Sequence, residues 1–312
     1  MPRCFPADEC RKLDGKIYAE SDEGYRVKIK LLVCCHQNVS VPEHPLLVPM
    51  QVGAALAQQR FPGFLYDDVG ENISDKNKSY CELTALYWAW KNLDADYYGL
   101  FHYRRYLYPC ETARRPYRIE KRPTAALCER LGYGRFAKFI FRYDMIMPKG
   151  EQMYVSVRQH YANAPFHHAV DLALIEEIIL EKHPEMTEAM ETYLGGTVHY
   201  FGNIAIMTKD IFHSYCEWLF GILAEYDRRS CVQGYSGQET RVNGYLAERL
   251  LGVYYTAAKM QGDLRTAELP KVHFVEDFAA RSKQKLVATL LPPSSRIRSV
   301  VKKLVGQIRT GK

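Results

Sequence analysis

The stretch over residues 72–108 constrains the fold more than any other part of this chain; it reads NISDKNKSYCELTALYWAWKNLDADYYGLFHYRRYLY. Its first half predicts a capped amphipathic helix over 79–92, and its second half predicts an apolar strand over 97–106. His102, Arg104 and Arg105 stand where that strand ends. Ligands of open α/β sheets bind outside the carboxyl ends of the strands. The stretch therefore predicts an α/β fold that binds an anion at this strand end.

The residue types at this strand end suit phosphate. Arginine offers a planar fork of N–H donors that matches phosphate oxygens, and histidine adds a neutral or charged donor. A nucleotide diphosphate would fit such a group. Spacing alone leaves an alternative open, in which Arg104 and Arg105 are surface charges of an edge strand that pair with acidic neighbours.

The rest of the chain alternates between strand and helix patterns. An apolar run over 26–35 predicts a buried first strand that ends at His36. We expect a short helix over 51–59, strands over 143–147, 199–208 and 272–275, a mainly helical region over 152–193, and helices over 210–228 and 239–258. Residues 109–138 lack a clean period, and we interpret them as an inserted excursion that faces the acceptor. The alternation predicts a mixed, mostly parallel sheet.

Several motif blocks resemble a bacterial family known as DUF4422, whose members occur among exopolysaccharide and capsule glycosyltransferases. The blocks are CH (35–36), PxQVGAA (49–55), DDxGxNISxKN (67–77), YCELTA (80–85), GLxHYRRY (99–106), HxxxDL (167–172), NIAIM (203–207) and RxxGYLAERL (241–250). The resemblance spans roughly residues 27–257. The blocks are long and ordered along the chain, so the resemblance is specific.

This resemblance implies a nucleotide-sugar-binding α/β domain of the GT-A type over residues 1–280. Most enzymes of that type hold a divalent metal with an Asp-x-Asp motif at a strand end. Here the equivalent place holds His-Tyr-Arg-Arg, so we expect that no metal cofactor is required. The one Asp-x-Asp motif, Asp94-Ala95-Asp96, precedes its strand, and we interpret it as a turn at the opposite end.

The motif blocks supply two groups of candidate binding residues. The donor nucleotide or its diphosphate is expected to contact His36, Asp68, Asn72, Lys76, Asn77, His102, Arg104 and Arg105, with His36 toward the base or ribose. Supporting or acceptor roles are expected for Glu82, His167, Asn203 and Arg241. Alternatives stay open: His36 can satisfy a local hydrogen bond, and Asn72 can cap a helix. Glu82 is expected to orient an arginine of the following strand.

Transfer with inversion needs a general base that takes a proton from the acceptor hydroxyl. Glu239 is the first choice because it follows a glycine-rich bend at a helix start. Asp171 and Glu248 are its rivals. The spacing places Asp171 on the same helix face as His167. This pair suits a contact with the acceptor hydroxyl and a structural hydrogen bond equally well. Glu248 lies seven residues after Arg241, so an ion pair between them is the alternative.

The basic charge of the chain is concentrated in a tail over residues 281–312. This tail has nine basic residues and no acid, whereas the chain as a whole has a net charge of +6. Apolar residues at helical spacing over 297–308 predict a basic amphipathic helix that binds an anionic membrane surface. The alternative is a helix that packs on the main domain. The tail has no aromatic residue for base stacking, so we expect no nucleic-acid partner.

The cysteine pattern and the N-terminal composition indicate where in the cell the protein is expected. The nine cysteines include no CxxC pair, and the N-terminus has no apolar core of a signal peptide, which favours a cytoplasmic protein at the inner face of the membrane. The resemblance implies transfer of a hexose from a UDP-sugar, galactopyranose or galactofuranose first, to a cell-surface polysaccharide or lipid-linked glycan. A nucleotide-sugar or phosphate-ester hydrolase and a non-catalytic module that binds anionic glycan or lipid are the alternatives.

Overall fold

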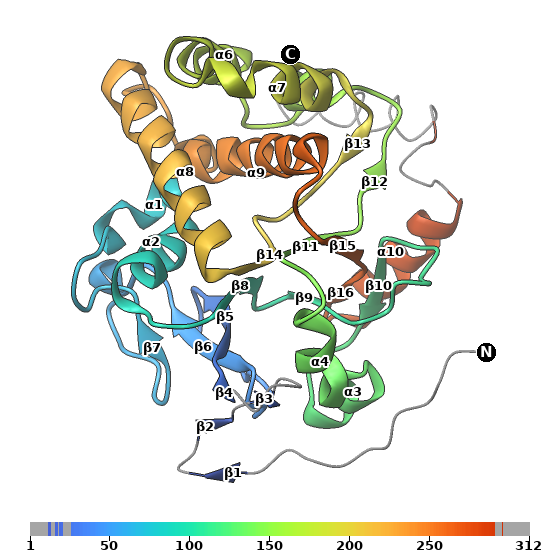
Figure 1. Ribbon diagram of the computed structural model, residues 1–312. Helices are drawn as coiled ribbons and strands as arrows, with labels where there is room; N and C mark the ends of the chain where they lie inside the picture. The colour runs from blue at the N-terminus through green and yellow to red at the C-terminus, as the bar shows by residue number, and fades with distance from the viewer. Residues whose placement is uncertain (1–11, 14–15, 18, 21–25, 291–294, 296–312) are drawn as a thin grey trace.

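The computed structural model describes residues 12–13, 16–17, 19–20, 26–290 and 295. Within these residues, ten strands form one sheet, which runs through the middle of the molecule (Figure 1). Seven of them lie side by side in the order β7 (Leu65–Tyr66), β6 (Leu47–Gln51), β5 (Ile29–Cys35), β8 (Tyr97–His102), β14 (Ala205–Thr208), β11 (Met145–Pro148) and β15 (Thr266–Leu269).

The other three strands extend the sheet beyond the carboxyl end of β8. They are β9 (Arg105–Leu107), β16 (Lys271–Phe274) and β10 (Tyr117–Glu120). Three two-stranded sheets are separate, and they pair β1 (Lys12–Leu13) with β2 (Lys16–Ile17), β3 (Ala19–Glu20) with β4 (Arg26–Val27), and β12 (Glu151–Gln152) with β13 (Val198–His199).

The large sheet is mixed, with five parallel and four antiparallel pairings among the described strands. The parallel pairings join β5 to both β6 and β8, so the carboxyl ends of β5 and β8 lie at the same edge of the sheet. This arrangement confirms the expected α/β fold class with a mixed, mostly parallel sheet. It also places His36 and His102 at neighbouring strand ends.

Helices cover both faces of the sheet (Figure 1). One face carries α2 (Leu83–Asn92), α8 (Lys209–Arg229) and α9 (Val242–Gln261), with α5 (Val157–Asn163), α6 (Ala169–Lys182) and α7 (Thr187–Gly195) stacked beyond them. The opposite face carries α3 (Ala125–Arg130) and α4 (Phe136–Ile140). Two further helices are α1 (Asn77–Tyr80) and α10 (Phe278–Leu290), and short 3₁₀ turns cover 54–56, 74–76, 133–135, 184–186 and 239–241.

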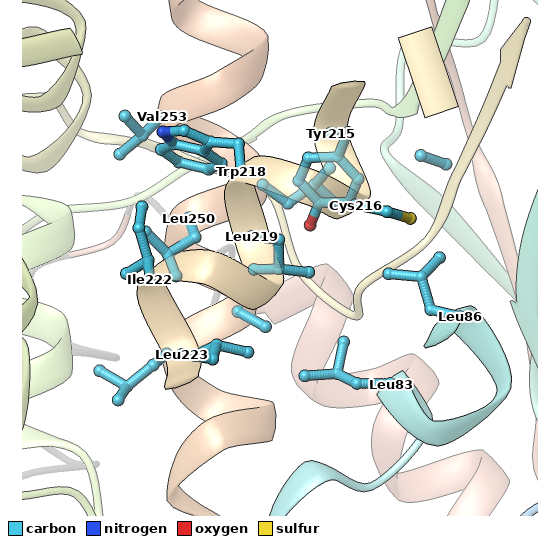
Figure 2. Packing of buried hydrophobic residues seen from close by; sticks show 14 of the residues in the cluster. Leu83, Leu86, Tyr215, Cys216, Trp218, Leu219, Ile222, Leu223, Leu250 and Val253 are labelled. Atoms are coloured by element: carbon cyan, nitrogen blue, oxygen red, sulfur yellow. The ribbon is translucent and has the colours of Figure 1, made fainter. Parts of the chain in front are cut away.

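Strand β5 explains why two hydrophobic cores form, one on each face of the sheet. Successive side chains of a strand point to opposite faces, so Leu32 and Cys34 join the core under α2, α8 and α9, while Leu31 and Val33 join the core over α3 and α4. In the larger core, apolar side chains of α8 interdigitate with those of α2 and α9 (Figure 2). Burial on both faces accounts for the continuous apolar run in the sequence.

Two glycines let α9 approach its neighbours closely. A Cβ atom at Gly244 would lie 3.0 Å from Sγ of Cys81, and one at Gly252 would lie 2.1 Å from Cζ of Tyr193. Cys81 itself has a positive φ of 53°, which is unusual for a residue with a side chain. The packing of α9 therefore constrains the backbone between α1 and α2.

Three expected elements were wrong in detail. Residues 51–59 form the end of β6 and a 3₁₀ turn rather than a helix. Proline cannot donate a hydrogen bond within a sheet, but β7 pairs only with Met50 and Gln51, so Pro49 has a strand partner on one side only. The helix expected over 79–92 is divided at Cys81 into α1 and α2. The strand expected over 199–208 is divided into β13 and β14, which leaves Asn203 in the connection.

The structure also differs from the sequence-based expectations at the end of β8, over residues 109–138 and at the start of the basic tail. The chain reverses after His102, so Arg105 begins β9 instead of ending the strand. The excursion over 109–138 is ordered as β10, α3 and α4, and its apolar side chains complete the second core. Helix α10 runs across the expected domain boundary at residue 280. The helix expected over 297–308 lies outside the described residues.

Candidate functional site

A tight reversal of the chain joins β8 to β9 at the carboxyl edge of the sheet. His102 pairs with Arg105 across it, and Tyr103 and Arg104 form the turn. The backbone N–H of Tyr103 donates to the carbonyl of Cys34 over 3.0 Å, which fastens the turn to the end of β5. The His36 ring centroid lies 5.0 Å from that of Tyr103 and 6.2 Å from that of His102. The first strand and the HYRR turn thus meet at one place.

Five basic side chains gather here, and we call them the basic cluster: His36, His102, Arg104, Arg105 and Arg241. Burial, and then the charges of Arg105 and Arg104, lower the pKa of His102 to about 2. Burial, and then the charges of Arg104 and Arg241, lower the pKa of His36. Both imidazoles are therefore neutral donors or acceptors in the free protein. An anion bound here would offset the positive charges of the arginines that lower the two pKa values.

The two arginines of the HYRR turn have no acidic partner among the residues that the structure describes. Within the described part of the chain, no carboxylate forms an ion pair with Arg104 or Arg105. This disfavours the alternative in which both are paired surface charges. Gly202, with φ 106°, passes close to Arg105: a Cβ atom there would lie 3.6 Å from Nη1. The guanidinium groups are positioned by the fold but not neutralised by it.

Arg241 reaches the cluster from the 3₁₀ turn before α9. Its Nε donates to Sγ of Cys81 over 3.3 Å, and its guanidinium lies 5.8 Å from the Tyr245 ring centroid. Burial raises the pKa of the Cys81 thiol to about 11, so the sulfur is a protonated acceptor rather than a thiolate. The strained backbone of Cys81 therefore helps to position a cation of the cluster.

Glu82 differs from its expected role. Its Oε1 accepts from Nδ2 of Asn203 over 3.1 Å, and the same Nδ2 donates to the carbonyl of Gly244 over 3.0 Å. Burial raises the pKa of Glu82, and hydrogen bonds from its own backbone and from Asn203, followed by the charge of Arg241, lower it in part. The expectation that Glu82 orients an arginine of the next strand is therefore corrected. It connects α2 through Asn203, whose φ is 45°, to α9.

Two predicted donor residues have ion-pair partners elsewhere. Asp68 binds both terminal nitrogens of Arg60 at 2.6 Å. Nζ of Lys76 lies 3.4 Å from the carboxylate of Asp227 on α8. The geometry thus ties both side chains to surface partners, and it does not bring them into the basic cluster.

The two predicted asparagines make local contacts. Oδ1 of Asn72 accepts from the backbone N–H of Ser74 over 3.1 Å, a local turn contact just before the 3₁₀ turn at 74–76, whose N-cap is Ile73 and not Asn72. Nδ2 of Asn77 donates to the carbonyl of Cys81 and to Oγ1 of Thr84. Asn77 also packs against Gly53, where a Cβ atom would lie 2.6 Å from its Oδ1. These contacts shape the backbone beside the cluster without entering it.

Asp67, the neighbour of Asp68, organises this region. Its side chain is fully buried and accepts four hydrogen bonds, from the backbone N–H groups of Gly53 and Ala54 and from the hydroxyls of Ser74 and Thr84. It joins the loop after β6 to α2. The sequence offered no way to tell which of the two adjacent acids is buried.

We expect Asp67→Ala to lower the free energy of unfolding by about 3 kcal/mol, because four buried donors lose their acceptor. Asp68→Ala, a matched control whose partner Arg60 is half exposed, should lower it by at most about 1 kcal/mol. Urea unfolding monitored by circular dichroism measures both. Equal losses in the two variants would contradict the assigned role of Asp67.

The candidate base residues are separated in the structure. Asp171 is 4% exposed, and its carboxylate accepts from the hydroxyls of Tyr226 (2.7 Å) and Tyr235 (2.9 Å). Glu239 contacts Nε2 of His168 at 3.1 Å and accepts from the N–H of Ser236 at 3.2 Å. These contacts give Asp171 a structural role, so we do not propose it as the base.

His167 also has a local environment. It precedes α6, so it does not share a helix face with Asp171. Its ring stacks on Tyr245 with centroids 4.0 Å apart, and its Nδ1 lies 2.8 Å from the carbonyl of Pro165. Burial lowers its pKa to about 4. The expected pair between His167 and Asp171 is therefore wrong.

Glu248 borders a cleft of about 640 Å³ beside the basic cluster. Its carboxylate accepts from Nη1 of Arg249 over 2.9 Å, so its partner is Arg249 and not Arg241. Arg105 belongs both to the basic cluster and to the lining of this cleft, which we call the β16 cleft. Its lining also includes Tyr117, Glu151, Phe201, Lys271, His273 and Lys283.

The Asp-x-Asp sequence lies at the other end of the sheet. Asp94 forms ion pairs with Lys28 (2.5 Å) and Lys209 (3.1 Å), and Asp96 accepts from the backbone N–H of Lys28. Both carboxylates precede β8, so they face away from the HYRR turn. Their geometry is that of a turn held by lysines, as the sequence position predicted.

The β16 cleft was not anticipated from the sequence. It depends on β10 and β16, which pair in parallel although residues 121–270 lie between them in the chain. The alternation of Lys271, Val272, His273 and Phe274 signals a strand, but nothing local indicates its partner. Only the tertiary structure brings Tyr117 and His273 together.

Comparison with known proteins gives two matches. The sequence model of a family described as "Domain of unknown function (DUF4422)" matches residues 30–259. Among solved structures, the chain is similar to the apo structure of the bifunctional glycosyltransferase WbbM, with 30% identity and a TM-score of 0.74. The alignment covers 79% of this chain and 45% of the WbbM chain, so the chain spans less than half of that protein. A search of curated proteins gave no match.

Proposed function

The chain belongs to the DUF4422 family, and from that premise we propose that it is a glycosyltransferase that moves a hexose from a UDP-sugar to a glycan acceptor. One observation carries the proposal: three arginines that form no ion pair with a described carboxylate meet two neutral histidines at the ends of β5 and β8. The similarity to WbbM supports the same reaction class. Galactose, in its pyranose or furanose form, is the first candidate for the sugar.

In the proposed reaction, the bond between the sugar C1 and the diphosphate oxygen breaks while a bond from the acceptor oxygen to C1 forms. The electron pair of the broken bond stays on the departing UDP, whose added negative charge the guanidinium groups stabilise. The proton of the acceptor hydroxyl passes to a carboxylate. Glu248 is the carboxylate we propose, because it borders both the basic cluster and the β16 cleft.

A divalent metal does not fit this site. Arg104 and Arg105 at the HYRR turn are cations, and their positive charges repel a metal ion from the neutral imidazole of His102 beside them. The carboxylates of Asp94 and Asp96 are bound to lysine groups at the far end of β8. We therefore propose that the basic cluster neutralises the diphosphate without a metal.

The test combines binding with turnover. We expect calorimetry to show that UDP and UDP-galactose bind, that GDP binds at least tenfold more weakly, and that EDTA leaves the dissociation constants unchanged. Radiolabelled sugar should pass from UDP-galactose into a membrane lipid extract. Strict dependence on manganese would contradict the metal-free site. Donor hydrolysis that ignores the extract would indicate a hydrolase instead.

The acceptor is proposed to be lipid-linked and the protein to act at the inner face of the cell membrane. Helix α10 supports this, because Phe278 and Leu286 on it are 73% and 59% exposed while Arg281 and Lys283 supply positive charge. Apolar side chains next to cations suit the interface of an anionic membrane. No helix in the described part of the chain is long and apolar enough to cross a bilayer.

We expect the double variant Phe278→Ser, Leu286→Ser to bind vesicles that contain anionic phospholipid about tenfold more weakly, because two apolar contacts with the acyl region are lost. The control is Val170→Ser, Leu180→Ser, which replaces two exposed apolar residues of α6. Co-sedimentation measures the bound fraction. Unchanged binding of the α10 variant would contradict the role of this helix.

A further inference from the structure

The β16 cleft is open beside the donor site but is not needed to hold a diphosphate. It lies along β10 and β16, the strands that extend the sheet beyond β8, and α10 forms its outer wall. Its volume of about 640 Å³ falls within the range of small-molecule sites. His36, which marks the end of the first strand, does not line it. The cleft therefore extends from Arg105 away from the first strand.

Aromatic rings form part of its lining. Tyr117 stacks on His273 with ring centroids 4.6 Å apart and an interplanar angle of 4°. Phe201 contributes a second ring. The C–H face of a sugar ring is apolar, so it gains by covering an aromatic face in the same way as other apolar groups. Flat rings at the cleft wall favour a saccharide over a peptide or an extended acyl chain.

The polar groups of the cleft are fixed in place. Lys271 is 1% exposed, and its Nζ donates to Oε1 of Glu151 over 3.0 Å and to the carbonyl of Phe201 over 3.3 Å. Nε2 of His273 is buried and has no hydrogen-bond partner among the described residues. Burial, and then the charges of Lys271 and Arg105, lower the pKa of His273 to about 3, so its ring is neutral.

This combination matches a ligand rich in hydroxyl groups. A buried nitrogen without a partner is costly unless a ligand completes its hydrogen bond. Two carboxylates line the cleft: Glu151, in the ion pair with buried Lys271, and Glu248, in the ion pair with Arg249. Glu248 is the more exposed of the two, with 19% of its side chain exposed against 10% for Glu151, so its carboxylate is the better placed to face a ligand. A hydroxyl near Glu248 would also lie beside Arg105, where the cleft meets the basic cluster.

We propose that the β16 cleft binds the terminal sugar of the acceptor glycan, with that sugar stacked on the Tyr117 ring and its reacting hydroxyl toward Glu248. The inference rests on the proposed glycosyltransferase function and assigns its acceptor site. It also gives α10 two surfaces: one lines the acceptor cleft, and the other carries the exposed Phe278 and Leu286. A lipid-linked glycan at a membrane surface would reach the cleft along this helix.

The first test is a pair of substitutions at Tyr117. Tyr117→Ala should raise the KM for the membrane-extract acceptor at least tenfold and leave the KM for UDP-galactose within twofold. Tyr117→Phe keeps the ring, so its acceptor KM should stay within twofold of the wild type. A purely structural role would instead change both constants together or lower the melting temperature. Unchanged acceptor KM in Tyr117→Ala overturns the proposal.

The second test blocks the cleft. Lys283→Cys is labelled with a bulky maleimide, and the controls are the labelled wild type and labelled Ser282→Cys, whose side chain is exposed on the same helix. The label on residue 283 should abolish transfer to the extract while UDP binding by calorimetry is unchanged. Retained transfer overturns the proposal, and so does a simultaneous loss of UDP binding, which would place the nucleotide in this cleft. A wild type that neither binds nor turns over UDP-sugars would instead refute the proposed function.

Discussion

Replacing Arg105 by alanine is expected to lower kcat for sugar transfer about 10²- to 10³-fold, the usual effect of removing one fixed donor from a developing negative charge. Its guanidinium has no carboxylate partner among the described residues, and it belongs to both the basic cluster and the β16 cleft. The UDP dissociation constant should also rise, because the ground-state diphosphate loses one charged contact. Steady-state kinetics and calorimetry measure the two effects.

Two variants make this result interpretable. Arg105→Lys keeps the charge but loses the planar fork, so we expect it to recover only part of the activity. Arg142→Ala removes a surface arginine that pairs with Glu111, and its activity should equal that of the wild type. In Arg105→Ala the pKa of His102 should rise, because among the nearby charges that of Arg105 lowers this pKa the most. Full activity of Arg105→Ala with a normal melting temperature would contradict the proposed donor site.

The basic cluster could be predicted in part from the sequence, and the reason is topological. Apolar runs identify β5 and β8 as buried strands, and residues that follow two such strands meet when the strands pair in parallel. That logic placed His36, His102 and Arg104 correctly relative to each other. The contribution of Arg241 depends on how the 3₁₀ turn before α9 packs against Cys81. No local pattern in the sequence reports such packing.

The partners of adjacent polar residues could not be predicted from the sequence. Asp67 and Asp68 are identical in chemistry, yet one is a buried acceptor of four hydrogen bonds and the other binds a surface arginine. The difference arises from the direction of each side chain at the end of β7. Lys76 and Asn77 followed the same motif, but their partners come from α8 and from the start of α2. Only the tertiary structure assigns these partners.

The choice of base illustrates the same limit at the level of function. Position after a glycine-rich bend favoured Glu239, whereas the geometry pairs Glu239 with His168 and leaves Glu248 at the cleft. A helix of twenty residues presents side chains to several environments, and the sequence does not say which of them borders a cavity. The pattern RxxGYLAERL located the helix. The neighbouring strands determine which of its residues face the cleft.

Glu248→Gln is expected to lower kcat for transfer about 10²- to 10⁴-fold, the range for loss of a general base, with the KM for UDP-galactose within twofold. Glutamine is chosen because its amide oxygen can still accept from buried Arg249, whose charge alanine would leave unpaired. Rapid NMR of the product should show inversion at C1, since a base of this kind serves a single in-line displacement.

Matched variants decide between the candidates. Glu239→Gln should keep kcat within twofold, because its carboxylate contacts His168 and Ser236. Asp171→Asn should lower the melting temperature more than kcat, because it weakens buried hydrogen bonds from Tyr226 and Tyr235. A large loss in Glu239→Gln with normal turnover in Glu248→Gln would move the base to the turn before α9. Retention of configuration would remove the need for a base at Glu248, since the acceptor proton would then follow a different route.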